Sequence, residues 1–133
     1  MISTFKKEGY KEFEHYSIWM EGGNIHTACK PNIIITIDIA NHMVAEREKL
    51  AKGIKLPILV DVRNILSIEG EARKFFASKK ANDLVRARAI LHNHILIYLA
   101  AKVFILADRP PAPTQVFYDK NFALRWLEIF KYN

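Results

Sequence analysis

The sequence has little cysteine, little glycine and no long apolar run. Cys29 is the only cysteine in 133 residues, so no disulfide can form within the chain. The five glycines are scattered and form neither a P-loop nor a dinucleotide-binding fingerprint, which disfavours nucleotide binding. The N-terminal stretch MISTFKKEGYKEFEHY lacks the continuous apolar core of a signal peptide. These absences fit a reducing compartment, and we expect the protein in the cytoplasm.

The composition is that of a globular protein. Half of the residues are hydrophobic and 26% are charged, which excludes disordered and fibrous classes. A length of 133 residues allows one domain with its own core and is short for two. We find no internal repeat. We therefore predict a single domain over residues 12–133, preceded by a flexible segment over residues 1–11.

The net charge of +6 arises mainly in the second half of the chain. Residues 67–133 hold 11 Lys and Arg against 6 Asp and Glu, and six of the basic residues fall within residues 73–88. Such a cluster could attract nucleic acid, an anionic membrane or an acidic protein. We interpret it as a solvated helix face, because no nucleic-acid-binding motif accompanies it, and we expect no nucleic-acid partner.

Two strands and a turn open the predicted fold. Residues 12–20 and 25–29 are rich in β-type side chains, and they flank Glu21-Gly22-Gly23-Asn24, the pattern of a hairpin turn. The aliphatic run over residues 56–62 is typical of a strand buried on both faces. Its neighbours in the sheet should be parallel, because helices separate it from the other strands.

Helical periodicity and capping residues predict the remaining elements. A helix over residues 37–51 begins at the N-cap Thr36 and ends before Gly53, with an apolar stripe that includes the stem of Arg47. The other predicted elements are helices over 67–78 and 79–85, a strand over 86–92, a helix over 95–107, a strand over 114–117, and a last helix capped by Asp119 with Phe122, Trp126, Ile129 and Phe130 on one face. The predicted fold class is α/β, in the order ββαβαβαβα, with an antiparallel hairpin followed by parallel strands and with helices covering the sheet.

The predicted helix over residues 95–107 is apolar except for Lys102. Thirteen residues are too few to cross a bilayer as a helix, which needs about 20, so we expect no transmembrane segment here. Nearly the whole circumference is apolar, so the sheet alone cannot cover it. Either the proline-rich loop and the last helix cover it within the monomer, or it forms a homodimer contact or an apolar ligand cavity. The candidate residues for the latter two are Ile95, Tyr98, Leu99, Lys102 and Phe104.

The stretch ILVDVRNILSIEGEAR and the ending APTQVFYDKNFALRWLEIF resemble the STAS domain, the SpoIIAA-like fold of anti-sigma-factor antagonists. The chain is similar in particular to small bacterial proteins of this type, which share an "LVD(V/L)R…S…EAR" step and a "PT…F…(D/E)…A…WL" tail. The resemblance covers roughly residues 12–131. It implies the same α/β fold and a regulatory role.

The resemblance also indicates what this chain lacks. In the antagonists an Asp ends the strand, and an Asp-Ser-Ser-Gly segment opens the next helix and carries a serine that a partner kinase phosphorylates. Asp61 falls on the strand Asp, while Glu69-Gly70-Glu71-Ala72 stands in place of Asp-Ser-Ser-Gly. The phosphoacceptor is therefore missing. Ser67 is the only hydroxyl left in the turn, and we interpret it as a helix N-cap rather than a phosphosite.

No catalytic, metal or cofactor site is predicted. No Ser-His-Asp or Cys-His set can be assembled around Asp61, which we expect to bond turn amides or to pair with Arg63. His26 and Cys29 would point to opposite faces of a strand and cannot easily share an ion. We favour structural or surface roles for all five histidines, which are His15, His26, His42, His92 and His94.

Two functions from different classes remain. The first is a non-enzymatic protein-interaction module that docks an unknown protein partner through Asp61, Arg63, Asn64, Ser67, Glu69, Glu71 and Arg73. A homodimer through residues 95–106 is compatible with this function. The alternative is a domain that binds a small apolar, lipid-like ligand. It is motivated by the excess of apolar residues around Tyr98, Phe104 and Trp126.

Overall fold

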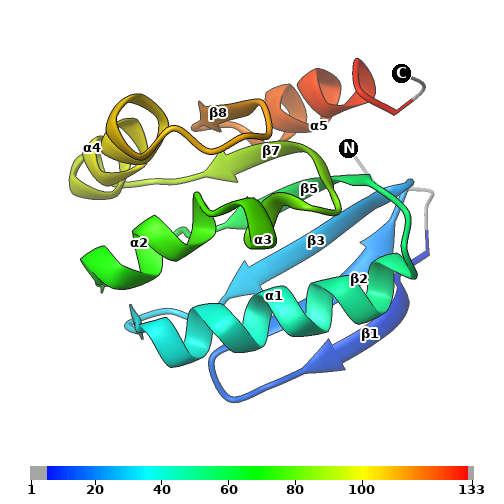
Figure 1. Ribbon diagram of the computed structural model, residues 1–133, viewed down its shortest axis with the longest axis horizontal. Coiled ribbons are helices and arrows are strands. Elements are labelled where there is room, and N and C mark those ends of the chain that lie inside the picture. The colour runs from blue at the N-terminus through cyan, green and yellow to red at the C-terminus, as the bar shows by residue number, and fades with distance from the viewer. Residues whose placement is uncertain (1–5, 132–133) are drawn as a thin grey trace.

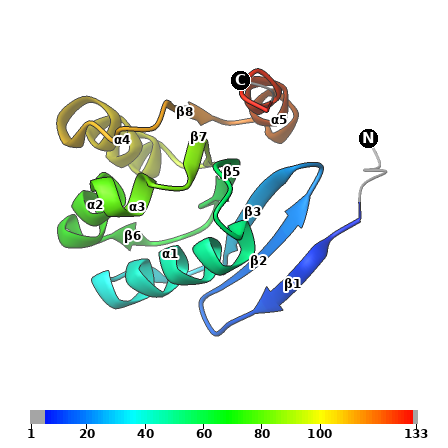
Figure 2. The same cartoon turned by 45° about the vertical axis from the view of Figure 1, so that its right-hand side comes forward.

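In the computed structural model, which describes residues 6–131, a six-stranded mixed sheet carries helices on both faces (Figures 1 and 2). The strand order is β1-β2-β3-β5-β7-β8; the first three strands are antiparallel, and β3, β5, β7 and β8 are parallel. The elements are β1 (Glu8–Glu12), β2 (Tyr16–Glu21), β3 (Asn24–Cys29), β4 (Ile34–Ile35), α1 (Ile37–Ala51), β5 (Leu56–Asp61), β6 (Ser67–Ile68), α2 (Gly70–Phe76), α3 (Lys79–Asn82), β7 (Val85–Leu91), α4 (Ile95–Val103), the π-helical turn η1 (Phe104–Asp108), β8 (Thr114–Phe117) and α5 (Lys120–Glu128). The predicted fold class is confirmed.

The predicted hairpin is formed by β2 and β3. Glu21 pairs with Asn24, so Gly22 and Gly23 alone make the turn, with φ of 61° and 82°. Two consecutive positive φ values match the twist of a hairpin and are accessible to glycine without strain. The strand before the turn begins at Tyr16, four residues later than predicted.

Strand β1 lies in the segment predicted to be flexible. Its five residues are all exposed, and they pair antiparallel with β2 through a bulge between Glu8 and Lys11. Lys11 also reaches Glu46 on α1 at 3.4 Å. The prediction missed this strand because an exposed edge strand shows no alternation of apolar and polar residues. Residues 1–5 of the predicted flexible segment, like residues 132–133, lie outside the described part of the chain.

Strand β5 lies inside the sheet, between β3 and β7 and parallel to both, as predicted. Its side chains alternate between two buried layers. Ile58 joins the larger core under α1, α2 and α4, whereas Leu59 packs with Leu127 under α5. Figure 2 shows α1 to α4 on one side of the sheet and α5 on the other. Burial on both faces explains why the run over residues 56–62 is nearly continuous in aliphatic side chains.

Ser67 does not cap a helix, contrary to the prediction. It lies in β6, which pairs parallel with β4 in a separate two-stranded sheet. The backbone N–H of Glu69 donates to the carbonyl of Ile35 at 3.0 Å, which keeps the chain extended up to that residue. The first helical residue is therefore Gly70, and Glu69 occupies the N-cap position without a side-chain hydrogen bond.

The last helix buries a different stripe from the one predicted. Ala123 and Leu127 are fully buried against the sheet, while Trp126 is partly buried. Phe122 and Ile129 are exposed, so their assignment to the buried face was wrong. Helix α5 packs on β5, β7 and β8 through Ala123 and Leu127, with Leu124, Trp126 and Phe130 partly buried beside them. None of the helices within residues 6–131 combines the length and the apolarity needed to cross a membrane.

Replacing Asp119 with alanine is expected to lower the free energy of unfolding by about 1 kcal/mol. The Asp119 carboxylate accepts hydrogen bonds from the backbone N–H groups of Asn121 at 2.8 Å and Phe122 at 3.2 Å, so both donors lose their partner. Urea denaturation followed by circular dichroism measures the loss. Asp119→Asn keeps the acceptor and serves as the control; an equal loss in both variants would contradict the capping role.

Candidate functional site

The turn after β5 is closed by its own side chains. Asp61 accepts a hydrogen bond from the backbone N–H of Arg63 at 3.0 Å, and the Arg63 guanidinium donates to both carboxylate oxygens at 3.0 and 2.7 Å. This pairing holds the pKa of Arg63 above its usual value. Asp61 therefore does what the sequence predicts, bonding a turn amide and Arg63, and it is not paired with a nucleophile or base.

Two asparagines join the turn after β5 to the turn after β7. The backbone N–H of Asn64 donates to Oδ1 of Asn93 at 3.1 Å, and Nδ2 of Asn93 donates back to Oδ1 of Asn64 at 2.9 Å. Asn64 has a φ of 70°, a left-handed conformation that asparagine tolerates better than most residues. The carboxyl ends of β5 and β7 are thus fixed side by side, at the edge where ligands and partners bind α/β sheets.

Some of the predicted docking residues are exposed at this edge of the sheet, and another is engaged in an ion pair. Arg63, Asn64, Ser67, Glu69 and Glu71 are exposed. Arg73 points elsewhere: its Nε donates to Oδ2 of Asp108 in η1 at 2.5 Å, an ion pair with only 25% and 8% of the two side chains exposed. Arg73 therefore ties α2 to η1 and is not part of an open docking surface, in contrast to the prediction.

One side of α4 and η1 is apolar and exposed. Ile97, Ala101 and Phe104 face the core, whereas five other apolar side chains face away from it. These are Ile95, Leu96, Leu99, Val103 and Leu106, which are 63%, 65%, 50%, 43% and 66% exposed. The possibility that the proline-rich loop and the last helix cover this helix within the monomer is therefore wrong.

Of the residues predicted to form a dimer or apolar-ligand surface, some are exposed and the others are buried or half-buried. Ile95 and Leu99 lie on the exposed side of α4. Phe104 is buried, and Tyr98 is half-buried with its ring 5.3 Å from that of His92. Lys102 is half-buried. Two of the five residues are thus available to a partner, while Phe104 faces an internal pocket.

This pocket, of about 90 Å³, lies between the sheet and helices α1, α2 and α4. Its walls are mainly aliphatic, with Phe104 and Phe76 at one side. Three arginines also line it, namely Arg47 from α1, Arg73 from α2 and Arg88 from β7. The side chain of Arg88 lies over the ring of Phe104 at 5.2 Å. An apolar pocket with arginines in its wall is the most specialised internal feature of the described residues.

The remaining titratable groups are placed for packing rather than for chemistry. His26 stacks on Trp19 at 5.3 Å, and burial lowers its pKa to about 4. Burial, helped by the charge of Asp61, raises the pKa of Cys29 to about 12, so the thiol stays protonated. Burial also lowers the pKa of His92. Within residues 6–131, no three His, Cys, Asp or Glu side chains are grouped so that they could hold a metal ion.

Comparison with known proteins places this architecture in a family. The profile of DUF7793, described as a domain of unknown function, matches residues 18–131. The chain belongs to the DUF7793 family. A comparison with curated protein sequences finds no match.

A solved structure shows which fold this DUF7793 chain has. It is similar to a protein of the DUF3478 family with a SpoIIAA-like fold from Shewanella loihica PV-4, with a TM-score of 0.56 and 19% sequence identity. The similarity covers 96% of this chain and 99% of that one. The DUF7793 chain thus has a SpoIIAA-like fold, which confirms the fold implied by the resemblance noted in its sequence. At this identity the comparison supports the fold alone.

Sequence reasoning placed the stem of Arg47 on a buried helix stripe, but it missed that the charged groups of Arg47 and Arg88 are buried in the DUF7793 chain. Arg47 and Arg88 are 5% and 3% exposed, although Arg88 was assigned to a solvated basic face. A signal was present in both cases. Arg47 falls on the apolar stripe of its helix, and Arg88 alternates with Ala87 and Ala89 in a strand that has neighbours on both sides. Arg88 has to face a core because the sheet is covered on both faces, and Arg47 has to face it because the apolar stripe of α1 packs on that sheet.

Proposed function

We propose that this chain is a non-enzymatic interaction module, and that it docks another protein through the carboxyl edge of its sheet. The docking surface consists of Leu66, Glu69, Glu71, Ile95, Leu96 and Leu99. The observation that carries the proposal is the exposure of the apolar side chains, since 60% of Leu66 and half or more of Ile95, Leu96 and Leu99 remain open. Contiguous apolar patches of a few hundred square ångströms on a monomer commonly mark binding sites.

The geometry supports treating the two parts of this surface as one. Leu66 lies two residues after Asn64 and Ile95 two residues after Asn93, and those asparagines are hydrogen-bonded to each other. Figure 1 shows that α2 and α4 extend from the same side of the molecule. Glu69 and Glu71 add negative charge at the start of α2. The partner that fits best offers an apolar recess bordered by basic side chains.

The absence of an activated nucleophile or base around Asp61, among the described residues, supports a role without catalysis. Asp61 is already neutralised by Arg63, and the Cys29 thiol is buried and protonated. Activated sites keep a reactive group near hydrogen-bond reach of its base. A reduced, buried thiol also supports placing the module in the cytoplasm.

Leu96→Lys is expected to abolish binding of the partner. The added ammonium group would have to be desolvated in an apolar contact, which typically weakens binding by more than tenfold. Tagged wild-type protein and the variant are used to capture partners from lysate of the source cells, and sedimentation velocity of the purified chain tests whether a second copy is the partner.

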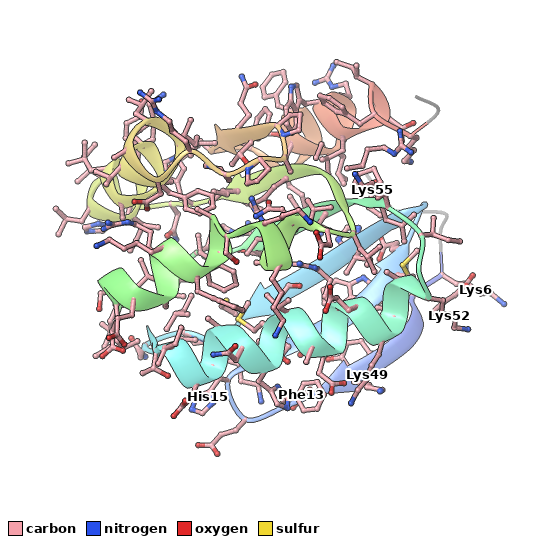
Figure 3. All side chains as sticks on the ribbon, in the orientation of Figure 1. Lys6, Phe13, His15, Lys49, Lys52 and Lys55 are labelled. Carbon is pink, nitrogen blue, oxygen red and sulfur yellow. The ribbon has the colours of Figure 1, made fainter. Side chains whose placement is uncertain are left out.

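The matched control is Ile54→Lys. The side chain of Ile54 is 60% exposed, close to the exposed fraction of Leu96. In the sequence Ile54 lies between Lys52 and Lys55, and Figure 3 shows these two lysines at the opposite end of the molecule from α4. This variant should capture the same partner, or form the same dimer, as the wild type. Identical capture and sedimentation by all three proteins would reject the docking surface.

The lipid-like alternative is not favoured by the size of the pocket. A cavity of about 150 Å³ holds one benzene molecule. The pocket of about 90 Å³ is smaller than that, and a long acyl chain would have to displace core side chains to enter. The pocket suits a much smaller molecule.

A further inference from the structure

Two positive charges are buried at the pocket without an ion-pair partner among the described residues, although the more distant charge of Glu48 acts on Arg47. Among residues 6–131, no carboxylate lies within ion-pair distance, 4.0 Å, of Arg47 or Arg88. The third arginine of the pocket, Arg73, is neutralised by Asp108. Buried charges in folded proteins are normally paired, because removing an ion from water costs several kcal/mol. Arg47 and Arg88 are exceptions that call for a physical explanation.

Arg47 and Arg88 donate hydrogen bonds to neutral oxygen atoms, and these acceptors satisfy only some of the N–H groups of the two guanidinium groups. Arg88 donates from Nη2 to Oδ1 of Asn82 at 3.0 Å and to the carbonyl of Phe76 at 3.4 Å, and from Nη1 to the hydroxyl of Thr114 at 3.3 Å. Arg47 donates from Nη2 to the carbonyl of Ala81. Its Nε is buried and has no partner. An unpaired buried donor of a charged group is costly, so this atom marks a place where an acceptor is missing.

The two guanidinium groups converge on one place. They bond adjacent residues of α3, Ala81 and Asn82, and both line the same pocket. The two guanidinium groups are close enough to interact electrostatically. Burial, and to a smaller extent the charge of Arg47, lowers the pKa of Arg88 to about 9. Burial lowers the pKa of Arg47 to about 10. Both groups remain protonated at neutral pH. Two like charges in one dry pocket repel each other, and an anion between them would remove that repulsion.

We propose that the pocket is a binding site for a small aliphatic carboxylate, held by Arg47 and Arg88. A planar carboxylate has two oxygens that match the donor fork of a guanidinium, and charge-assisted bonds of this kind are about twice as strong as neutral ones. Apart from Thr27 and the paired Arg73, the remaining walls are apolar, with Ile58, Val60 and Ile90 from the sheet and Phe104 from η1. These walls favour a ligand with a short hydrocarbon part over a fully hydrated ion.

The volume limits the ligand to a short chain. By comparison with the cavity of about 150 Å³ that holds the six carbons of benzene, a pocket of about 90 Å³ accepts roughly three or four non-hydrogen atoms. It therefore takes the hydrocarbon part of the ligand, while the carboxylate lies at the pocket wall beside the guanidinium groups. Isobutyrate combines such a part with one carboxylate and is the probe we choose. This site is separate from the exposed surface of α4, so the two proposals fail or succeed independently.

The test is a thermal unfolding titration of the full chain with sodium isobutyrate at constant ionic strength. At twenty times the dissociation constant we expect the Tm to rise by about 6 °C. Neutral isobutyramide has nearly the same shape and should not raise the Tm. Sodium phosphate has charge without a hydrocarbon part, and it should raise the Tm only by the small amount that excluded salts cause in any folded protein. A Tm that does not rise with isobutyrate, or that rises as much with isobutyramide or phosphate, would overturn the proposal.

The substitutions Arg47→Met and Arg88→Met test whether these two arginines bind the carboxylate. Each removes one charge and keeps an unbranched side chain, and each should weaken isobutyrate binding by roughly tenfold or more. Lys55→Met is the matched control, because its side chain is exposed and does not line the pocket, and it should bind like the wild type. Unchanged binding in both arginine variants would overturn the assignment.

Nuclear magnetic resonance of the wild-type chain tests the site without any variant. Isobutyrate should shift the backbone amide signals of Ala81, Asn82 and Phe104 with one common dissociation constant, since these residues surround the two guanidinium groups. Shifts confined to other parts of the chain would place the anion elsewhere and reject the pocket, even if an arginine variant failed to fold.

Discussion

Leu59→Ala is expected to lower the free energy of unfolding by about 3 kcal/mol. Leu59 is 2% exposed and lies in the central strand β5, where it packs with Leu91, Ala123 and Leu127. The variant loses the transfer free energy of the deleted atoms and leaves a cavity that the surrounding strands cannot close, because β5 is held on both sides by parallel neighbours. Urea denaturation followed by tryptophan fluorescence measures the change.

Leu66→Ala is the control for this substitution. It deletes the same atoms from a side chain that is 60% exposed, so we expect its effect to stay within about 0.5 kcal/mol. Similar losses in the two variants would mean that β5 is not an interior strand. The placement of the docking surface would then fail as well, because that surface is built on the loops that follow β5 and β7.

Acidification from pH 7.5 to pH 5.0 is expected to lower the free energy of unfolding by about 2 kcal/mol through His26. Burial lowers the pKa of His26 from its ordinary 6.5 to about 4 in the folded protein. Between these two values the unfolded chain binds a proton that the folded protein does not, so stability falls as the pH falls. Burial lowers the pKa of His92 too, which acts in the same direction.

His26→Phe should remove most of this pH dependence. Phenylalanine cannot be protonated, and it retains an aromatic ring against Trp19. Urea midpoints at pH 5.0, 6.0 and 7.5 give the comparison, and His15→Gln, at a side chain that is 40% exposed, is the control that should keep the wild-type slope. The carboxylates of Glu12 and Glu46, whose pKa values are lowered by lysine hydrogen bonds, matter only below this range. A wild-type stability that is constant from pH 7.5 to 5.0 would refute the burial of a neutral His26.

Much of the fold could be predicted because the elements are encoded by nearby residues. The hairpin follows from Gly22 and Gly23, α1 from the Thr36 cap and a regular apolar stripe, and β5 from an unbroken aliphatic run. Strands β4 and β6 could not be predicted. Each has two residues, and each exists only because the other lies beside it. Such pairing depends on contacts between distant parts of the chain, which override local preference.

The same distinction between local and long-range contacts decides which features of the candidate sites could be predicted from the sequence. The Asp61–Arg63 pair joins residues two positions apart, and the sequence predicts it. The Arg73–Asp108 pair spans 35 positions, and the pocket gathers side chains from α1, α2, β7 and η1. The apolar character of α4 could be read from the sequence, but the side of the helix that stays open could not. That side is determined by the packing of Ile97, Ala101 and Phe104 onto a core whose other residues are distant in the sequence.

Both margins of the sheet are poorly suited to main-chain pairing with another molecule. At one margin, β1 carries Glu8, Lys11 and Glu12 and is kinked by its bulge, with Gly9 at a φ of 64°. At the other, β8 has only four residues and is preceded by Pro113. Charge, irregularity and shortness are the features by which the edge strands of natural sheets avoid edge-to-edge pairing with strands of other molecules, which would lead to fibrils. Growth by strand addition is therefore discouraged, and any assembly of this domain has to form through side chains.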